Sequence, residues 1–430
     1  MGSTADIPAS EAPAPPRRTA DVRNYAIVTG AYWADTIADG AIRLLVLFYF
    51  YELGYSPLAV ASLFLFYELF GVITNLGGGY LAARWGLKST LLMGLGTQLA
   101  ALTMLAAAPQ SWLVVAYVMA AQGLSGIAKD LTKMSSKSAV KLVAGDEQGS
   151  LYKWVAILTG SKNALKGVGF FLGGLLLSLV GFQAALLMLA GLVAAALAGT
   201  LALMRGDLGK PNKKAKFGQM FSNTRAVNVL AAARIFLFAS RDVWFVIAVP
   251  VFLRTELNWT FWQVGTFLAV WVIGYGIVQA LAPRFIRGHG GADPDGRTAT
   301  WLAFALAVFP AGIAAALLAG GDPGVVLVGG LIVFGVIFAA NSAVHSYLIL
   351  AYAQGDKVAM NVGFYYMANA GGRLIGTVLS GALYQLQGLQ ACLWASVVFV
   401  VGAGVLSLLL PATSRGGRRE PGGISGAATT

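Results

Sequence analysis

Long apolar segments recur along the whole chain of 430 residues, and they restrict the environment in which it can fold. Most are about 20 residues or longer, the length that an α-helix needs to cross a bilayer. Charged residues make up only 11% of the chain, whereas soluble proteins carry about 25%. The sequence therefore predicts an all-α membrane protein with twelve transmembrane helices. The predicted spans are 25–51, 57–83, 89–108, 112–137, 151–180, 182–204, 226–253, 260–284, 299–319, 325–353, 358–384 and 389–410.

Basic residues gather in alternate connections between the spans. The richest connection, 205–225, holds four lysines and two arginines, whereas the intervening connections hold one, Arg254. Loops rich in Lys and Arg remain in the cytoplasm, so both termini are expected there. The first residues are rich in Ala and Pro and lack the apolar core of a signal peptide. The expected division is a disordered cytoplasmic tail (1–24), an N-terminal six-helix bundle (25–204), a basic cytoplasmic linker (205–225), a C-terminal six-helix bundle (226–410) and a second disordered tail (411–430).

The two halves of the chain repeat one another. QAAL at 183–186 returns as QACL at 390–393, an offset of 207, and ELGYSPLAVASLF at 52–64 resembles ELNWTFWQVGTFL at 256–268, an offset of 204. A parallel repeat of two six-helix halves is the arrangement of major facilitator transporters. The offset of 207 also pairs Gly169 with Gly376, Gly174 with Gly381, Gly181 with Gly388, and Lys166 with Arg373.

A second segment carries the same resemblance. Residues 79–88, GYLAARWGLK, resemble the superfamily's loop between its second and third helices, Gly-x-Leu-x-Asp-Arg-x-Gly-Arg-Lys. Ala83 replaces the Asp and Leu87 replaces an Arg, so the acid that usually helps to close the cytoplasmic side is absent. The resemblance implies the major facilitator fold, with its twelve helices in two pseudo-symmetric six-helix bundles.

Charged residues are distributed unevenly among the spans. Every third span, 89–108, 182–204, 299–319 and 389–410, contains no Asp, Glu, Lys or Arg, and neither does 325–353. In the facilitator fold every third helix faces lipid, and the four evenly spaced spans are that set. The other spans hold eight deep cations against five acids, and a cavity with surplus positive charge favours an anionic substrate. The cations are Arg43, Lys129, Lys133, Lys162, Lys166, Arg234, Arg241 and Arg373, and the acids are Asp35, Asp39, Glu68, Asp130 and Asp242.

Two lysines in the span 151–180 are the strongest site candidates. Lys162 and Lys166 are four residues apart and share a helix face. Each costs about 2.5–3.5 kcal/mol at mid-membrane, so this face is expected to line a polar cavity. The predicted substrate-binding residues are these two with Arg373, Arg241, Arg234, Lys133, Lys129, Arg43, Asn369, Tyr365, Asn341 and His345. The candidates for proton binding are Asp35, Asp39 and Glu68, since burial disfavours a charged carboxylate.

Several of these residues have alternative interpretations. Asp39 and Arg43 either form a structural ion pair or act separately, and Lys129 and Lys133 either line the cavity or extend to the cytoplasmic interface. Arg241 and Asp242 are adjacent and are expected to have different partners. Lys166 and Arg373 are expected to be free of carboxylate partners and to grip the two ends of the substrate. Asn361, Tyr365, Asn369 and Arg373 follow one another at four-residue steps and share a helix face. Asn361 is therefore expected to line the same cavity.

The sequence contains no motif for nucleotide hydrolysis, metal binding or catalysis. GLKST at 86–90 lacks the order of a P-loop, and no metal-ligand cluster or nucleophile–base pair is present. The basic residues lie in short loops and inside spans, which argues against nucleic-acid binding. A single cysteine, Cys392, excludes a disulfide within the chain and a site built from several soft thiolate ligands. We therefore expect no enzyme, no catalytic residue, no cofactor and no metal.

Two further segments resemble a narrower family. GLSGIAKDLTKMSSKSAVKL (123–142) and KWVAILTGSKNALKGVGFFLGG (153–174) are similar to bacterial organoarsenical efflux permeases of the ArsJ type. The resemblance implies export of 1-arseno-3-phosphoglycerate across the bacterial inner membrane, arsenate resistance, and glyceraldehyde-3-phosphate dehydrogenase as the functional partner that makes the substrate. It fits the surplus of cations, because that substrate carries anionic groups.

Two transport functions and one other class remain open at this point. The first is a proton-coupled secondary transporter that exports the organoarsenical by alternating access, working as a monomer in the lipid bilayer. The second is an organic-phosphate/phosphate exchanger or a general organic-anion efflux carrier that uses the same cations. A membrane receptor or scaffold is the third, but it would not need eight deep cations and two repeated halves.

Overall fold

The computed structural model of the chain describes residues 19–144, 150–204, 224–286, 294–352 and 358–411. Within these ranges the chain forms helices joined by short connections, and no strand occurs. Most of the two tails and of the connection between the halves, for which we expected disorder and a linker, lies outside the described residues. The first helix begins at Thr19, six residues before the predicted start at 25.

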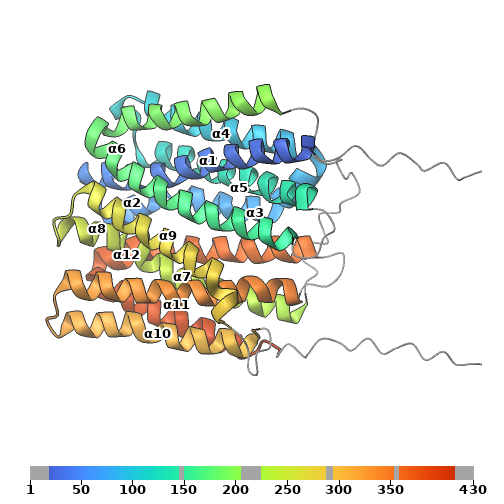
Figure 1. Ribbon diagram of the computed structural model, residues 1–430. Helices are drawn as coiled ribbons and strands as arrows, with labels where there is room; N and C mark the ends of the chain where they lie inside the picture. Colours follow the sequence, from blue (N-terminus) through green and yellow to red (C-terminus); the bar gives the residue numbers. More distant parts are fainter. Residues whose placement is uncertain (1–18, 145–149, 205–223, 287–293, 353–357, 412–430) are drawn as a thin grey trace, which may run out of the picture.

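The N-terminal half runs from α1 to α6, and the C-terminal half from α7 to α12. Figure 1 shows the first half in the upper part of the view and most of the second half below it. The helices of the first half are α1 (Thr19–Glu52), α2 (Pro57–Leu63), α3 (Leu65–Trp85), α4 (Leu87–Ala107), α5 (Val115–Ala144) and α6 (Ser150–Leu203), with a short 3-10 helix at Gln110–Trp112. Those of the second half are α7 (Arg225–Phe245), α8 (Ala248–Thr255), α9 (Phe261–Phe285), α10 (Gly296–Leu318), α11 (Pro323–Tyr352) and α12 (Val358–Ser407).

Three helix starts in the second half are fixed by their own sequence. The side chain of Thr224 accepts from the backbone N–H of Val227 and caps α7. Thr260 and Gln263 form a reciprocal capping box at the start of α9, and Asp295 forms one with Thr298 at the start of α10. Such caps satisfy backbone donors that the first turn of a helix leaves without partners.

Two glycines reverse the chain inside α6 and α12. Gly181 has φ 77° and ψ 177°, and Gly388 has φ 70° and ψ −165°. Glycine adopts positive φ at little cost because it has no Cβ. The two residues are 207 positions apart, so the repeat predicted from the sequence places the same turn in each half. Figure 1 shows α6 folding back at its turn, which makes one continuous element cross the bundle twice.

The lengths of the helices account for twelve crossings. Eight stretches of the described residues are long and apolar enough to span a membrane, and two of them, Ser161–Leu203 and Asn361–Ser407, are 43 and 47 residues long. A single crossing needs about 20 residues, so each of these crosses twice. The helices α1 and α5 are not among the eight; α1 carries three charged residues in its middle, and α5 carries five along its length. With them, the structure has the twelve helices of the fold predicted from the sequence.

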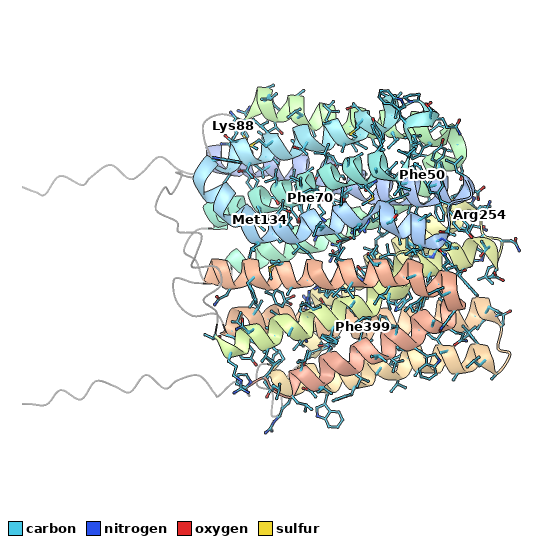
Figure 2. All side chains as sticks on the ribbon, turned by 180° about the vertical axis from the view of Figure 1, so that it is seen from behind. Phe50, Phe70, Lys88, Met134, Arg254 and Phe399 are labelled. Atoms are coloured by element: carbon cyan, nitrogen blue, oxygen red, sulfur yellow. The ribbon has the colours of Figure 1, made fainter. Side chains whose placement is uncertain are left out.

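The uncharged spans form much of the outer surface. Large apolar side chains are exposed on the second part of α6 (Leu187), on α10 (Trp301) and on the second part of α12 (Val398). In water such a surface would associate, but in a bilayer it faces lipid. The polar side chains are turned inward instead. Figure 2 shows Lys88 and Arg254 near opposite ends of the bundle, and the site described below lies between these ends.

Two glycines related by the repeat bring the halves together. A Cβ at Gly174 of α6 would meet the backbone of Phe261 and Trp262 at the start of α9, and one at Gly381 of α12 would meet Pro57 and Leu58 at the start of α2. These contacts lie at the end of the bundle where α1 ends and α2 begins, which we call the far end. Glu52 and Arg254 form an ion pair of 3.3 Å at the same end. The far end is therefore closed by equivalent contacts from both halves.

Adding side chains at Gly174 and Gly381 should move the two halves apart at the far end. We expect Gly174→Val combined with Gly381→Val to lengthen the distance between spin labels attached at exposed Leu53 and Trp262, in a background in which Cys392 is replaced by Ser. Pulsed electron paramagnetic resonance measures this distance. Gly191→Val is the matched control, because a Cβ there meets nothing within 4 Å. An unchanged distance in the double variant would contradict the sealing role.

Candidate substrate site

Charged side chains from both halves meet where the two bundles touch. We call this group the interface cluster. It consists of Asp39 and Arg43 of α1, Glu68 of α3, Lys129 of α5, Lys166 of α6, Arg241 and Asp242 of α7, and Arg373 of α12. Five cations therefore stand against three carboxylates, which leaves two positive charges.

Glu68 joins the two halves at the centre of the interface cluster. Its Oε1 accepts from Arg43 Nη2 at 2.7 Å and from Arg373 Nη2 at 2.6 Å. Glu68 is completely buried, and its second oxygen, Oε2, has no hydrogen-bond partner among the described residues. Because Arg43 belongs to the N-terminal half and Arg373 to the C-terminal half, one carboxylate oxygen bridges the boundary.

A second carboxylate extends this bridge into the C-terminal half. Asp242 Oδ2 lies 3.6 Å from Arg373 Nε, and Asp242 Oδ1 accepts from Arg241 Nη2 at 2.5 Å. Two expectations from the sequence are therefore wrong. Arg373 is not free of carboxylates, because Glu68 comes from a helix 305 residues away. Arg241 and Asp242, although adjacent, pair with each other, because the long guanidinium bends back to its neighbour. The prediction that Lys166 and Arg373 bind the two ends of the substrate as two cations free of carboxylates is therefore wrong for Arg373.

Asp39 and Arg43 do not form the ion pair that their spacing allowed. Tyr67 donates its hydroxyl to Asp39 Oδ1 at 2.5 Å, and Arg43 pairs with Glu68 instead. The guanidinium of Arg43 also lies 4.5 Å from the centroid of the Tyr67 ring. Tyr67 thus orients one acid and stabilises one cation. Tyr67 was not among the site residues predicted from the sequence, although it directly precedes Glu68.

Lys166 is the cation of the cluster with the fewest neutralising contacts. Its ammonium lies 5.6 Å from the centroid of the Phe170 ring, and no carboxylate lies within 4.0 Å of it among the described residues. Lys129 Nζ lies 4.0 Å from the centroid of the Tyr67 ring and likewise has no described carboxylate partner at that distance. Lys162 lies one turn before Lys166 on α6 and is half-buried. The uncompensated charge of the cluster therefore resides on its lysines.

A second polar group lies within the C-terminal half around Arg234 of α7. Its Nε donates to Asn369 Oδ1 at 2.9 Å, and its Nη1 donates to the carbonyl oxygen of Ser342 at 3.3 Å. Its guanidinium lies 5.0 Å from the Tyr365 ring centroid. Within the part of the chain that the structure describes, no carboxylate lies within 4.0 Å of Arg234. This arginine, 4% exposed, is therefore a buried cation without a counter-ion among the described residues.

Asn341 and His345 of α11 belong to the same region. Both are completely buried, and both polar atoms of each side chain lack a hydrogen-bond partner among the described residues. Asn361 of α12 is also buried, and its Oδ1 has no described partner. Buried polar atoms normally have partners, so these side chains are available to hydrogen-bond a polar ligand or water.

The remaining candidates lie inside the N-terminal half. Lys133 donates to Asp130 Oδ1 at 2.6 Å and to Asn75 Oδ1 at 2.5 Å, so it neither extends to the membrane surface nor offers a free charge. Asp35 accepts from the Thr132 hydroxyl at 2.5 Å through Oδ2. Its other oxygen, Oδ1, has no partner among the described residues, and Asp35 is completely buried.

The two halves and the buried charges between them define a polytopic membrane carrier. A family model described as Major Facilitator Superfamily matches residues 28–355, and the chain belongs to this superfamily. No curated protein sequence matches the chain. The superfamily predicted from the repeat and from the segment 79–88 is therefore confirmed.

Solved structures of other superfamily members share the fold. One, described as giving structural insights into substrate recognition in proton dependent oligopeptide transporters, is 14% identical with a TM-score of 0.68, covering 90% of this chain and 96% of that one. Another, a POT family transporter in complex with a thioalcohol conjugated peptide, is 13% identical with a TM-score of 0.73, covering 90% and 95%. At these identities the similarity establishes the fold alone.

The unpartnered polar atoms near Arg234 lead to a stability prediction. We expect Asn341→Leu to leave the melting temperature of the purified protein unchanged or to raise it, because the amide has no described hydrogen bond to lose. The matched control is Asn75→Leu, which removes contacts to Asp130 and Lys133 and should destabilise by about 1–3 kcal/mol. Differential scanning fluorimetry measures both variants. Equal destabilisation would mean that Asn341 has a structural partner.

Proposed function

We propose that this protein is a secondary active transporter that exports an anionic phosphorylated organoarsenical, 1-arseno-3-phosphoglycerate, by alternating access. The observation that carries the proposal is Lys166, a half-buried lysine between the two halves whose ammonium has no described carboxylate within 4.0 Å. A cation held in low dielectric attracts an anion far more strongly than one at the surface. Two surplus positive charges in the interface cluster suit a substrate that carries more than one negative charge.

The membrane arrangement in this proposal follows the charges of the loops. Both termini lie in the cytoplasm of a bacterium, the carrier spans the inner membrane, and it works as a monomer. Its substrate comes from glyceraldehyde-3-phosphate dehydrogenase, and its export makes cells resistant to arsenate. The resemblance of segments 123–142 and 153–174 to organoarsenical permeases supports this choice of substrate.

Within the site, the residues have different tasks. Lys166 and Lys129 make the first contact with the substrate, because their charges are the least compensated. Arg241, Arg373 and Arg43 add forked donors, which suit the oxygens of tetrahedral phosphate and arsenate groups. A more distant polar group of the substrate binds Arg234, Asn341, His345, Tyr365 and Asn369. Lys162 continues the cationic face of α6 by one turn, and Lys133 remains in its ion pair.

Asp35 is the proton-binding residue that this proposal selects. Glu68 is held by two arginines and Asp39 accepts a hydrogen bond from Tyr67, whereas the described partner of Asp35 is only the neutral hydroxyl of Thr132. A buried carboxylate without a cation gains most from taking up a proton. The charged groups that act on Asp35 are Asp39, Lys129 and Asp130. Protons that enter along their gradient would drive export of the anion.

Removing the least compensated charge should abolish transport. We expect Lys166→Ala to eliminate uptake of radiolabelled 3-phosphoglycerate into everted vesicles, and Lys162→Ala to weaken it. Cells with either variant should lose arsenate tolerance, with the protein still inserted in the membrane. Lys88→Ala is the control, because Lys88 lies outside the site, near the end of the bundle opposite Arg254 (Figure 2), where it donates to the carbonyl oxygen of Met204. Near-normal tolerance in cells carrying both substitutions at 162 and 166 would overturn the proposal.

Removing the proton-binding carboxyl should separate coupling from binding. We expect Asp35→Asn to transport at the same rate whether or not the pH gradient across everted vesicles is collapsed, while 3-phosphoglycerate still binds. The wild type should slow when the gradient is collapsed. If the wild type is also insensitive to the gradient and instead requires phosphate on the opposite side, the organic-phosphate/phosphate exchanger is the better description.

A further inference from the structure

Glu68 occupies the position where a substrate oxyanion would neutralise the arginines. Its carboxylate lies between Arg43 and Arg373, with donor–acceptor distances of 2.7 and 2.6 Å. Lys129 is the third cation acting on it. A bound oxyanion that accepts from both guanidinium groups would have the same arrangement. The difference is that the carboxylate of Glu68 is attached to α3.

The two ion pairs of Glu68 differ in what movement does to them. Arg43 and Glu68 belong to the same half, so a rigid movement of the halves preserves their contact. Arg373 belongs to the other half, so movement of one bundle against the other breaks its contact with Glu68. The pair of Glu68 with Arg373 therefore forms and breaks as the carrier changes state, and the pair with Arg43 does not.

A purely structural explanation of this pair is weak. Buried ion pairs add little stability, because removing two charges from water costs about as much as their attraction returns. A cation left alone at the same depth is strongly unfavourable. Asp242 compensates Arg373 only in part, because it lies 3.6 Å away and also pairs with Arg241. The contribution of Glu68 is therefore greatest when no substrate anion is bound.

From these observations, and resting on the proposed transport of an anion, we infer that Glu68 is an internal counter-ion that replaces the substrate in the empty carrier. When substrate binds, its oxyanion takes over Arg373 together with Lys166, and Glu68 remains with Arg43. When substrate leaves, Glu68 returns to Arg373. The empty carrier can then cross back through its closed state without carrying an unpaired arginine. It performs net export and does not depend on anion exchange.

The consequence is a specific separation of two transport modes. In exchange, the carrier returns with another anion bound, so Arg373 is neutralised from outside the protein. In net efflux, the carrier returns empty and depends on Glu68. A variant without the carboxylate should therefore lose net efflux to a much greater extent than it loses exchange.

The test uses the full chain reconstituted in proteoliposomes loaded with radiolabelled 3-phosphoglycerate. Net efflux is measured into medium without anion, and exchange into medium with unlabelled 3-phosphoglycerate. For Glu68→Gln we expect the ratio of net efflux to exchange to fall at least ~10-fold below that of the wild type, since Arg43 then has no described carboxylate partner and Arg373 keeps only the contact of 3.6 Å to Asp242, which opposes the empty return. Glu68→Asp is the matched control, and its ratio should stay within about threefold of the wild type, because the carboxylate is retained.

Each outcome decides between the inference and its alternatives. An unchanged ratio in Glu68→Gln, or a wild type that only exchanges, overturns the counter-ion inference while transport of the anion stands. The wild-type ratio and Glu68→Asp decide the question even if Glu68→Gln does not insert. A wild type that moves the anion in neither mode overturns the proposed function itself.

Discussion

The high cost of an unpaired charge inside a membrane governs this structure. Arg43 and Arg373 approach each other across the boundary of the halves only because Glu68 lies between them and accepts from both. Asp242 extends the compensation to Arg241. Once these arginines are neutralised, the remaining surplus rests on Lys166 and Lys129. The site therefore has two kinds of cation, one held by the protein's own acids and one available to an incoming anion.

The repeat explains the framework but not the chemistry. Gly181 and Gly388 reverse the chain in the same way, and Gly174 and Gly381 make equivalent contacts across the boundary. The charges at equivalent positions differ, since Lys166 has no described carboxylate beside it whereas Arg373 has two. Duplicated backbone contacts suit a symmetric movement, and an asymmetric set of charges suits a ligand whose ends are unlike.

Much of the fold and only part of the site could be predicted from the sequence. Hydrophobic length and loop charge predict the crossings, and the offset of 207 predicts the paired glycines, because these are local properties of the chain. Helical spacing identifies residues that share a face, such as Lys162 and Lys166, but says nothing of a neighbouring helix. The partners of Arg373 and the selection of Tyr67 over Arg43 by Asp39 depend on contacts between helices that are distant in sequence. For that reason the prediction for Arg373 was wrong, and Tyr67 was missing from the predicted site.

The turn at Gly181 has a mechanical consequence. It joins the inward-facing part of α6, which carries Lys166, to the outer part, which exposes Leu187 and Met188, without an intervening loop. A hairpin without slack moves as one body. When the inner arm shifts around a substrate, the outer arm must displace the acyl chains that surround it. The thickness and fluidity of the bilayer thereby become part of the resistance that each transport cycle must overcome, and the same holds for α12 at Gly388.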